Sequence, residues 1–158
     1  MGNKITIIKI INKDIEKTKE LIRQYLIWVE SDLSFQQVDE ELATFSGKYE
    51  EPDGSFFTAK DGDEVIGCIG LRKIQPEICE MKRLFVKNEY KGMGIGKELI
   101  KIIIEEGRKK GYKKMRLDTL PKMKAAQNLY KEFGFYLIER YVSNPIEGTV
   151  YMEKILSD

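Results

Sequence analysis

A run of three glycines carries the clearest chemical signal in the sequence. Gly92, Gly94 and Gly96 stand at every second position, with Lys91 and Lys97 on either side. Glycine has no Cβ atom, so a ligand can approach its backbone closely. Helical periodicity begins here, and the first N–H groups of a helix are unpaired and lie at the positive end of its dipole. The run Lys91-Gly92-Met93-Gly94-Ile95-Gly96-Lys97 is therefore suited to a phosphate or pyrophosphate.

Two familiar phosphate-binding motifs do not describe this run. The dinucleotide fingerprint has the spacing G-x-G-x-x-G early in a βαβ unit, whereas the glycines here follow G-x-G-x-G deep in the chain. The P-loop has Ser or Thr after its Gly-Lys pair, and here Glu98 follows Gly96 and Lys97. A glycine-rich loop without a ligand stays open as the alternative at this point.

The strand predicted just before the glycines changes its pattern part-way. Over residues 78–86, Cys79 and Met81 are apolar with charged residues between them, but beyond Arg83 the apolar positions take the other parity, beginning with Leu84. One extra residue is the signature of a β-bulge, because a shift of one moves every later side chain to the other face of the sheet. Bulges often lie beside active sites, where they turn backbone N–H groups out of the ladder.

Composition indicates an ordinary globular protein. At 158 residues, with 42% hydrophobic and 34% charged residues, the chain is expected to form one domain over residues 1–158 with its own core. The net charge of +1 gives no general reason to expect nucleic acid or an anionic membrane as a partner. No apolar run reaches membrane length and no signal peptide is recognised, so a cytoplasmic protein is expected.

The chain contains no histidine and only two cysteines. The lack of histidine excludes Ser-His and Cys-His nucleophile pairs and removes the usual ligand of catalytic zinc, so no metal is expected. Cys68 and Cys79 fall inside predicted strands, and their spacing is not that of a zinc motif. They are expected to be buried thiols in a reducing compartment.

Hydrophobic periodicity predicts an α/β arrangement around one mixed sheet. The capping box Ser34 to Gln37 and the glycines Gly47, Gly111 and Gly134 mark helix ends. Strands are predicted over residues 5–11, 56–60, 65–73, 78–86, 113–118, 135–137 and 149–155. Helices are predicted over residues 15–29, 34–47, 94–110 and 122–133.

Three segments together resemble the GNAT superfamily of N-acetyltransferases. They are Leu84-Phe85-Val86, the run Tyr90-Lys91-Gly92-Met93-Gly94-Ile95-Gly96, and Leu129-Tyr130-Lys131-Glu132-Phe133-Gly134-Phe135. They resemble, in order, the fourth strand of that family, its pyrophosphate loop and its late motif L-Y-x-x-x-G-F. The resemblance implies a single-domain α/β fold with a mixed, mostly antiparallel sheet, helices on both faces and a bulged fourth strand.

The resemblance also implies roles for these residues with acetyl-CoA as co-substrate. Backbone groups of Leu84, Phe85 and Val86 would hold the pantetheine arm and the acetyl carbonyl, and amides from Lys91 to Lys97 would bind the pyrophosphate. Tyr130 matches the general acid that protonates the leaving thiolate. The chain departs from the family at Lys91, where Gln or Arg is common, and at Met123, where a cofactor-binding Asn is frequent.

The reaction implied is acetyl transfer to a primary amine by direct attack in a ternary complex. A lysine-like ammonium has a pKa of about 10.4 and must lose a proton before it attacks. Without histidine, the base is predicted to be Glu80, directly or through water, since partial burial would make its carboxylate a stronger base. Pairing of Glu80 with Lys82 or Arg72 is the structural alternative, and Asp118 is the second candidate for the base. Cys68 and Cys79 lack an activating base in sequence reach, which argues against an acyl-enzyme.

The acceptor pocket is expected between the first two helices and the last hairpin. Its acidity favours a cationic small-molecule or peptide amine, and its predicted lining residues are Trp28, Glu30, Asp32 and Tyr141. A coenzyme A-binding sensor or scaffold without turnover is the main alternative, although it would not need the hydroxyl of Tyr130. A nucleic-acid binder using the basic stretch of residues 108–124 is a weaker one, because aromatic residues are not interleaved there. A monomer or a homodimer is expected.

Overall fold

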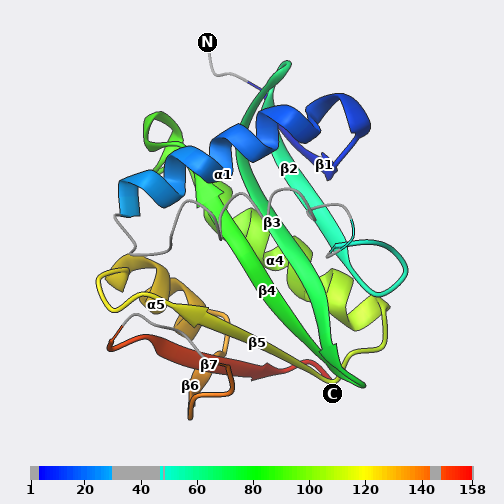
Figure 1. Ribbon diagram of the computed structural model, residues 1–158, viewed down its shortest axis with the longest axis vertical. Coiled ribbons are helices and arrows are strands. Elements are labelled where there is room, and N and C mark those ends of the chain that lie inside the picture. The colour runs from blue at the N-terminus through cyan, green and yellow to red at the C-terminus, as the bar shows by residue number, and fades with distance from the viewer. Residues whose placement is uncertain (1–3, 30–46, 48, 143–146, 158) are drawn as a thin grey trace.

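The protein forms a seven-stranded sheet with helices on both faces (Figure 1). The computed structural model describes residues 4–29, 47, 49–142 and 147–157, and for residues 27–29 the backbone alone. The strands are β1 (Ile5–Lys9), β2 (Ser55–Asp61), β3 (Glu64–Gln75), β4 (Ile78–Val86), β5 (Lys114–Thr119), β6 (Tyr136–Ile138) and β7 (Val150–Ile155). The helices are α1 (Ile15–Val29), α4 (Ile95–Lys109) and α5 (Lys124–Glu132), with 3-10 turns η1 (Asn12–Asp14) and η2 (Asn88–Tyr90).

The sheet has the order β1-β2-β3-β4-β5-β7-β6 and is antiparallel except at one place. Strands β4 and β5 are parallel neighbours, and α4 connects them. A parallel pair needs such a crossover, whereas the antiparallel pairs β2–β3 and β3–β4 need only short turns. The prediction of a mixed, mostly antiparallel sheet with helices on both faces is confirmed.

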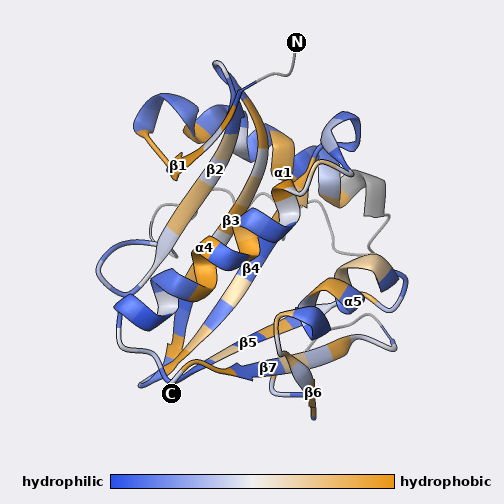
Figure 2. Ribbon diagram, turned by 180° about the vertical axis from the view of Figure 1, so that it is seen from behind, coloured by the Kyte–Doolittle hydropathy of each residue, from blue (hydrophilic) through white to orange (hydrophobic). Residues whose placement is uncertain are grey.

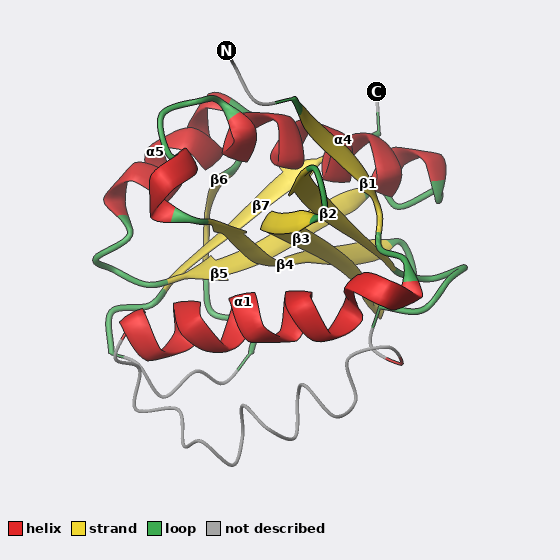
Figure 3. Cartoon of the chain, turned by 90° about the horizontal axis from the view of Figure 1, so that it is seen from above, coloured by secondary structure: helices red, strands yellow, loops and turns green. Residues whose placement is uncertain are grey.

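Two hydrophobic clusters hold the helices to the sheet. Helix α1 lies on one face and α4 and α5 lie on the other (Figure 3). The apolar stripe of α1, with Leu21 and Ile22 at its centre, packs against Phe56, Cys68 and Phe85. The other cluster is formed by α4 with the opposite face of β2–β5, and Figure 2 shows α4 crossing this face. Each helix is thus stabilised by burial of its amphipathic face.

The predicted elements agree closely with those observed, with ends that shift by a few residues. Gly94 caps the N-terminus of α4 and Gly111 follows its C-terminus at φ +87°, as expected. The helix predicted over residues 34–47 lies almost wholly outside the described residues. Gly67 on β3 faces the carbonyl oxygen of Phe85, which a Cβ atom would approach to 3.0 Å.

Gly70 on β3 tests how tightly the cluster under α1 is packed. A Cβ atom there would lie 2.7 Å from Tyr49 Cε1 and 2.8 Å from Phe56 Cδ2, and both rings are buried. We expect Gly70→Ala to lower the free energy of unfolding by about 1–3 kcal/mol, the usual cost of overpacking, measured by urea denaturation. Gly47→Ala is the control, because its Cβ atom would meet nothing within 4 Å. Equal stability of the two variants would contradict this account of the packing.

Candidate functional site

The predicted bulge is present in β4. Lys82 pairs with Gly70 and Phe85 pairs with Cys68, so two residues of β4, Arg83 and Leu84, oppose the single residue Ile69 of β3. Arg83 has φ +61°, which a residue with a side chain rarely adopts. Beyond this point Phe85 turns its ring towards α1, whereas Leu84 and Val86 pack against the cluster under α4. The bulge thus produces the change of parity seen in the sequence.

Beside the bulge, β4 separates from its parallel neighbour. The ladder between β4 and β5 runs from Ile78↔Lys114 to Glu80↔Arg116 and ends there, and the two strands diverge in Figure 1. The edge of β4 from residue 81 to residue 86 that faces β5 therefore takes no part in that ladder. A strand edge outside a ladder offers backbone N–H and C=O groups to a ligand.

The glycine run lies between the end of β4 and the start of α4. Gly92 and Gly94 have φ of +85° and +80°, and a Cβ atom at either would meet nothing within 4 Å. The space over these two residues is therefore open to a ligand. The turn before the run is held by the hydroxyl of Tyr90, which donates to Asp61 Oδ2 at 2.5 Å. The loop, the dipole of the 15-residue α4 and the exposed Lys91 and Lys97 form a site suited to an anion.

Tyr130 lies on the inner face of α5 and is 7% exposed. Its ring packs edge-on against Phe135, with 5.9 Å between the centroids. Burial raises the pKa of the Tyr130 phenol well above its usual value, and the nearby Tyr25 and Asp118 add to the shift. The group therefore remains a hydroxyl that can donate a hydrogen bond at any physiological pH.

Tyr25 was not among the predicted site residues. Its ring stacks on Phe85 of the bulged strand, with 3.5 Å between centroids and 22° between planes, and its hydroxyl lies 3.8 Å from Met123 Sδ. Burial raises its pKa to about 12. Tyr25 belongs to the apolar stripe of α1 that packs on the sheet. Helical spacing alone gave no signal that this stripe crosses the bulge beside Tyr130.

Glu80 is separated from the bulge by two residue pairs and is fully buried, where the sequence predicted partial burial. Its Oε1 accepts a hydrogen bond from Arg72 Nε at 2.7 Å, and its Oε2 accepts one from the Tyr141 hydroxyl at 2.5 Å. The alternative of a pair with Arg72 is confirmed. Lys82 instead lies 3.5 Å from Asp118 Oδ1, the second candidate for the base.

Tyr141 joins Glu80 to the strands beyond β4. The Arg116 guanidinium lies 5.2 Å from the centroid of the Tyr141 ring, and the Tyr151 ring packs edge-on at 5.6 Å. Burial and the Glu80 carboxylate together raise the pKa of the Tyr141 phenol far above its usual value. Arg116 in turn donates to Glu153, which also accepts from the Tyr136 hydroxyl at 2.6 Å.

Three predicted lining residues of the acceptor pocket are not placed by the structure. Trp28 lies in the last turn of α1, where the backbone alone is described, and Glu30 and Asp32 lie outside the described residues. Tyr141 is placed, and its hydroxyl contacts Glu80. The structure therefore joins one predicted lining residue directly to the predicted base.

The two cysteines are buried free thiols, as expected. Burial raises the pKa of each to about 12, so neither is a thiolate nucleophile at neutral pH. Within the described residues, no group of three or more His, Cys, Asp or Glu side chains is arranged to hold a metal ion.

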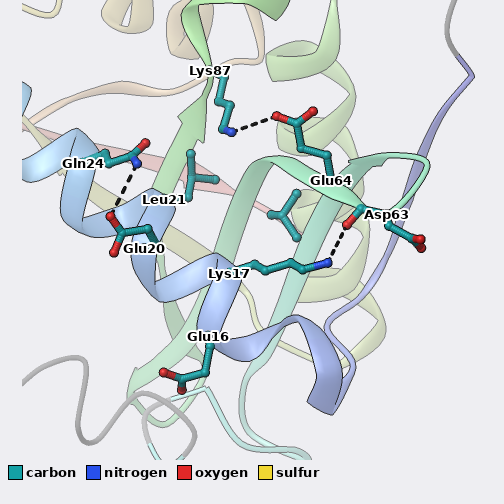
Figure 4. Close-up of a pocket in the computed structure, with 9 residues that line it drawn as sticks. Glu16, Lys17, Glu20, Leu21, Gln24, Asp63, Glu64 and Lys87 are labelled. Carbon is teal, nitrogen blue, oxygen red and sulfur yellow. Dashed lines mark hydrogen bonds and ion pairs between the residues drawn. The ribbon is translucent and has the colours of Figure 1, made fainter.

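A separate groove of about 670 Å³ lies between α1 and the β2–β3 hairpin (Figure 4). Lys17 donates to the carbonyl oxygen of Asp63 and Lys87 to Glu64, so both of its lysines are engaged. Among the residues that the structure describes, none of the predicted site residues lines this groove. Its lining is Glu16, Lys17, Glu20, Leu21, Gln24, Asp63, Glu64, Val65 and Lys87.

Comparison with known proteins identifies the family. The acetyltransferase (GNAT) family model matches residues 16–135. An uncharacterised N-acetyltransferase of Schizosaccharomyces pombe is 42% identical over 147 residues, which cover 92% of this chain and 90% of that protein. The chain belongs to the acetyltransferase (GNAT) family. It is an acyltransferase of the N-acetyltransferase type, as its three motifs implied.

Solved structures of other acetyltransferases have the same fold. A GNAT-family acetyltransferase of Staphylococcus aureus Mu50 has a TM-score of 0.87 at 22% identity, over 98% of this chain and 100% of that one. The PaiA N-acetyltransferase of Thermoplasma acidophilum, solved in complex with coenzyme A, has a TM-score of 0.74 at 23% identity, over 96% and 99%. In the part of this acetyltransferase that the structure describes, no helix is long and apolar enough to cross a membrane.

The glycine loop of this acetyltransferase can be tested with two matched positions. Gly94 and Gly111 stand at opposite ends of α4, with φ of +80° and +87° and open space at both. We expect Gly94→Glu to abolish binding of coenzyme A in calorimetric titration, because its carboxylate would repel a phosphate at the N-terminus of α4. Gly111→Glu introduces the same strain and charge at the other end and should bind normally. Equal affinities in both variants would exclude the glycine loop as the phosphate site.

Proposed function

We propose that this acetyltransferase moves an acetyl group from acetyl-CoA to a primary amine by direct attack in a ternary complex. The observation that carries the proposal is the arrangement on β4. A bulge at Arg83 and the end of the β4–β5 ladder lie on the same strand, and that strand leads into an open glycine loop at the start of α4. The buried hydroxyl of Tyr130 lies near Asp118, which continues β5 beyond the point where the ladder ends.

The residues present fit coenzyme A. The space over Gly92 and Gly94, which a side chain would fill, supports a pyrophosphate bound between Lys91 and Lys97. The backbone edge of Leu84, Phe85 and Val86 that lies outside the β4–β5 ladder supports binding of an extended pantetheine arm. The amides of the arm can form hydrogen bonds with such a strand edge. Acetyl-CoA supplies the activated acetyl group as a thioester, so no metal or other cofactor is required.

Two groups of the chain would stabilise the charge that develops during transfer. A backbone N–H at the bulge would donate to the acetyl oxygen, and one such donor contributes about 10²–10³ in rate. The Tyr130 hydroxyl would donate to the leaving sulfur. A free phenol has a pKa of about 10 and a thiol of about 8.5, so full proton transfer is uphill in solution. Since burial raises the pKa of Tyr130 further, it acts best as a hydrogen-bond donor to a partly formed thiolate.

The acceptor is proposed to be a cationic primary amine on a small molecule or a peptide. Support comes from the carboxylates of Glu80 and Asp118, which lie at the place where β4 and β5 separate. Glu80 is the proposed base. Because Glu80 is fully buried, it would take the proton of the amine through an intermediate group and not by direct contact.

Thiol release from acetyl-CoA tests the proposal. The amines are ethylamine, glycine, spermidine, kanamycin and an alanine-initiated peptide, each at saturating acetyl-CoA, with the acetylated product confirmed by mass spectrometry. Turnover with at least one amine is expected. Tight binding of coenzyme A without turnover of any amine would favour the alternative, a sensor or scaffold module.

Tyr130→Phe separates catalysis from binding. We expect it to lower kcat by about 10²-fold, the low end for a positioned acid, with little change in the affinity for coenzyme A. Tyr112→Phe is the control, because it also removes a buried hydroxyl, one that donates to the carbonyl oxygen of Asp53 away from the bulge. A Tyr130→Phe variant as active as Tyr112→Phe would remove Tyr130 from the mechanism.

A further inference from the structure

Both oxygens of the Glu80 carboxylate are engaged inside the protein. Arg72 Nε donates to Oε1 and the Tyr141 hydroxyl donates to Oε2. Glu80 has no exposed surface, whereas Tyr141 is only half-buried. A molecule that approaches Glu80 from solution therefore meets either Tyr141 or Arg72, whose side chain is 31% exposed. Of these two groups, only the phenol can accept a hydrogen bond as well as donate one.

The Tyr141 hydroxyl can take part in two hydrogen bonds, one as donor and one as acceptor. Its proton is committed to Glu80 at 2.5 Å, which leaves the phenol oxygen able to accept a hydrogen bond from a second group. Its ring contacts the Arg116 guanidinium, 5.2 Å from the ring centroid, and the Tyr151 ring at an interplanar angle of 76°. The phenol is thus a fixed bridge between a buried carboxylate and the outside of the site.

We propose that Tyr141 is a catalytic residue that carries the proton of the acceptor ammonium to Glu80. The inference rests on the proposed function and deepens it. One N–H bond of the ammonium breaks, its electron pair stays on nitrogen as the attacking lone pair, and the proton joins the Tyr141 oxygen. At the same time the original Tyr141 proton moves to Glu80 Oε2. The phenol ends neutral, Glu80 ends protonated, and no other reactant is needed.

The surroundings of Tyr141 favour this simultaneous transfer of two protons, here called the relay, over a stepwise transfer through a Tyr141 phenolate. Burial and the Glu80 charge hold the pKa of the phenol far above its usual value, so it is not ionised between transfers. A concerted relay does not require ionisation, because the phenol gains one proton as it loses another. The ionisable and charged groups that act on or contact Tyr141 come from three strands, namely Glu80 on β4, Arg116 and Asp118 on β5, and Tyr151 on β7. Arg72 on β3 holds the other oxygen of Glu80.

The relay predicts that Tyr141→Phe lowers kcat/KM by a factor that depends on the protonation state of the acceptor amine. The probe is whichever of the five amines above gives the largest kcat/KM. At a pH two units below the pKa of that amine about 1% of it is neutral, and at its pKa about half is neutral. Without the relay only the neutral amine reacts, so Tyr141→Phe should lower kcat/KM by about 100-fold at the lower pH and about twofold at the higher.

The chain offers a closely matched control. Tyr136 also donates its hydroxyl to a buried glutamate, Glu153, on the same sheet face, but Glu153 is joined to Arg116 and not to Glu80. Tyr136→Phe should leave kcat/KM within about twofold of the wild-type value at both pH values, well below the loss expected for a positioned acid or base. The double variant Tyr141→Phe with Glu80→Gln should lose no more than Glu80→Gln alone, because groups that act as one unit are not additive.

The possible outcomes separate the relay from the proposed function. A loss of kcat/KM in Tyr141→Phe that is smaller at the higher pH, where more of the amine is neutral, supports the relay. An equal loss at both pH values, or no loss at all, would overturn the relay and leave the acetyltransferase reaction standing. A wild-type protein that turns over none of the five amines would overturn the proposed function, and the relay with it.

Discussion

The hydrogen-bonded ladder between β4 and β5 ends after the pair Glu80 and Arg116, and the rest of the site depends on that end. Parallel strands normally continue side by side, because each buried backbone group needs a partner. Here the bulge at Arg83 shifts the register of β4 against β3 at the place where β4 leaves β5. This edge of β4, which lies outside the β4–β5 ladder, is followed by the turn η2 and then by the glycine run at the start of α4. The separation of β4 from β5 therefore places this strand edge and the N-terminus of α4 next to each other along the chain, where one extended ligand could contact both.

Three tyrosines with neutral phenols lie at or near this candidate site. Tyr25 packs on the bulged strand, Tyr130 lies on the inner face of α5, and Tyr141 donates to Glu80. Burial raises the pKa of all three, so each remains a hydroxyl across the physiological range. A phenol that stays protonated is a dependable donor, and it transfers protons only in concert with a second group. Since the chain has no histidine, the proposed proton transfers are assigned to Tyr130, Tyr141 and the buried carboxylate of Glu80.

Features that arise from neighbouring residues were predicted correctly. The change of parity between Met81 and Leu84 predicted the bulge, since a strand has a fixed two-residue period. The spacing of Gly92 and Gly94 predicted an open loop, and both adopt the positive φ that glycine tolerates. The burial of Cys68 and Cys79 followed from their positions within apolar strands. Each of these conclusions needed only a few consecutive residues.

What the sequence determined by itself was the α/β order, the mixed sheet, the bulge, the glycine loop and the resemblance of three motifs to one family. Only the tertiary structure decided which groups touch. Arg72, Glu80 and Tyr141 come from β3, from β4 and from the segment between β6 and β7, and their contacts join residues eight and 61 positions apart. Sequence periodicity specifies the face on which a side chain lies, but not which distant side chain shares that face. Strand order and register set those contacts, and they follow from the packing of the whole sheet.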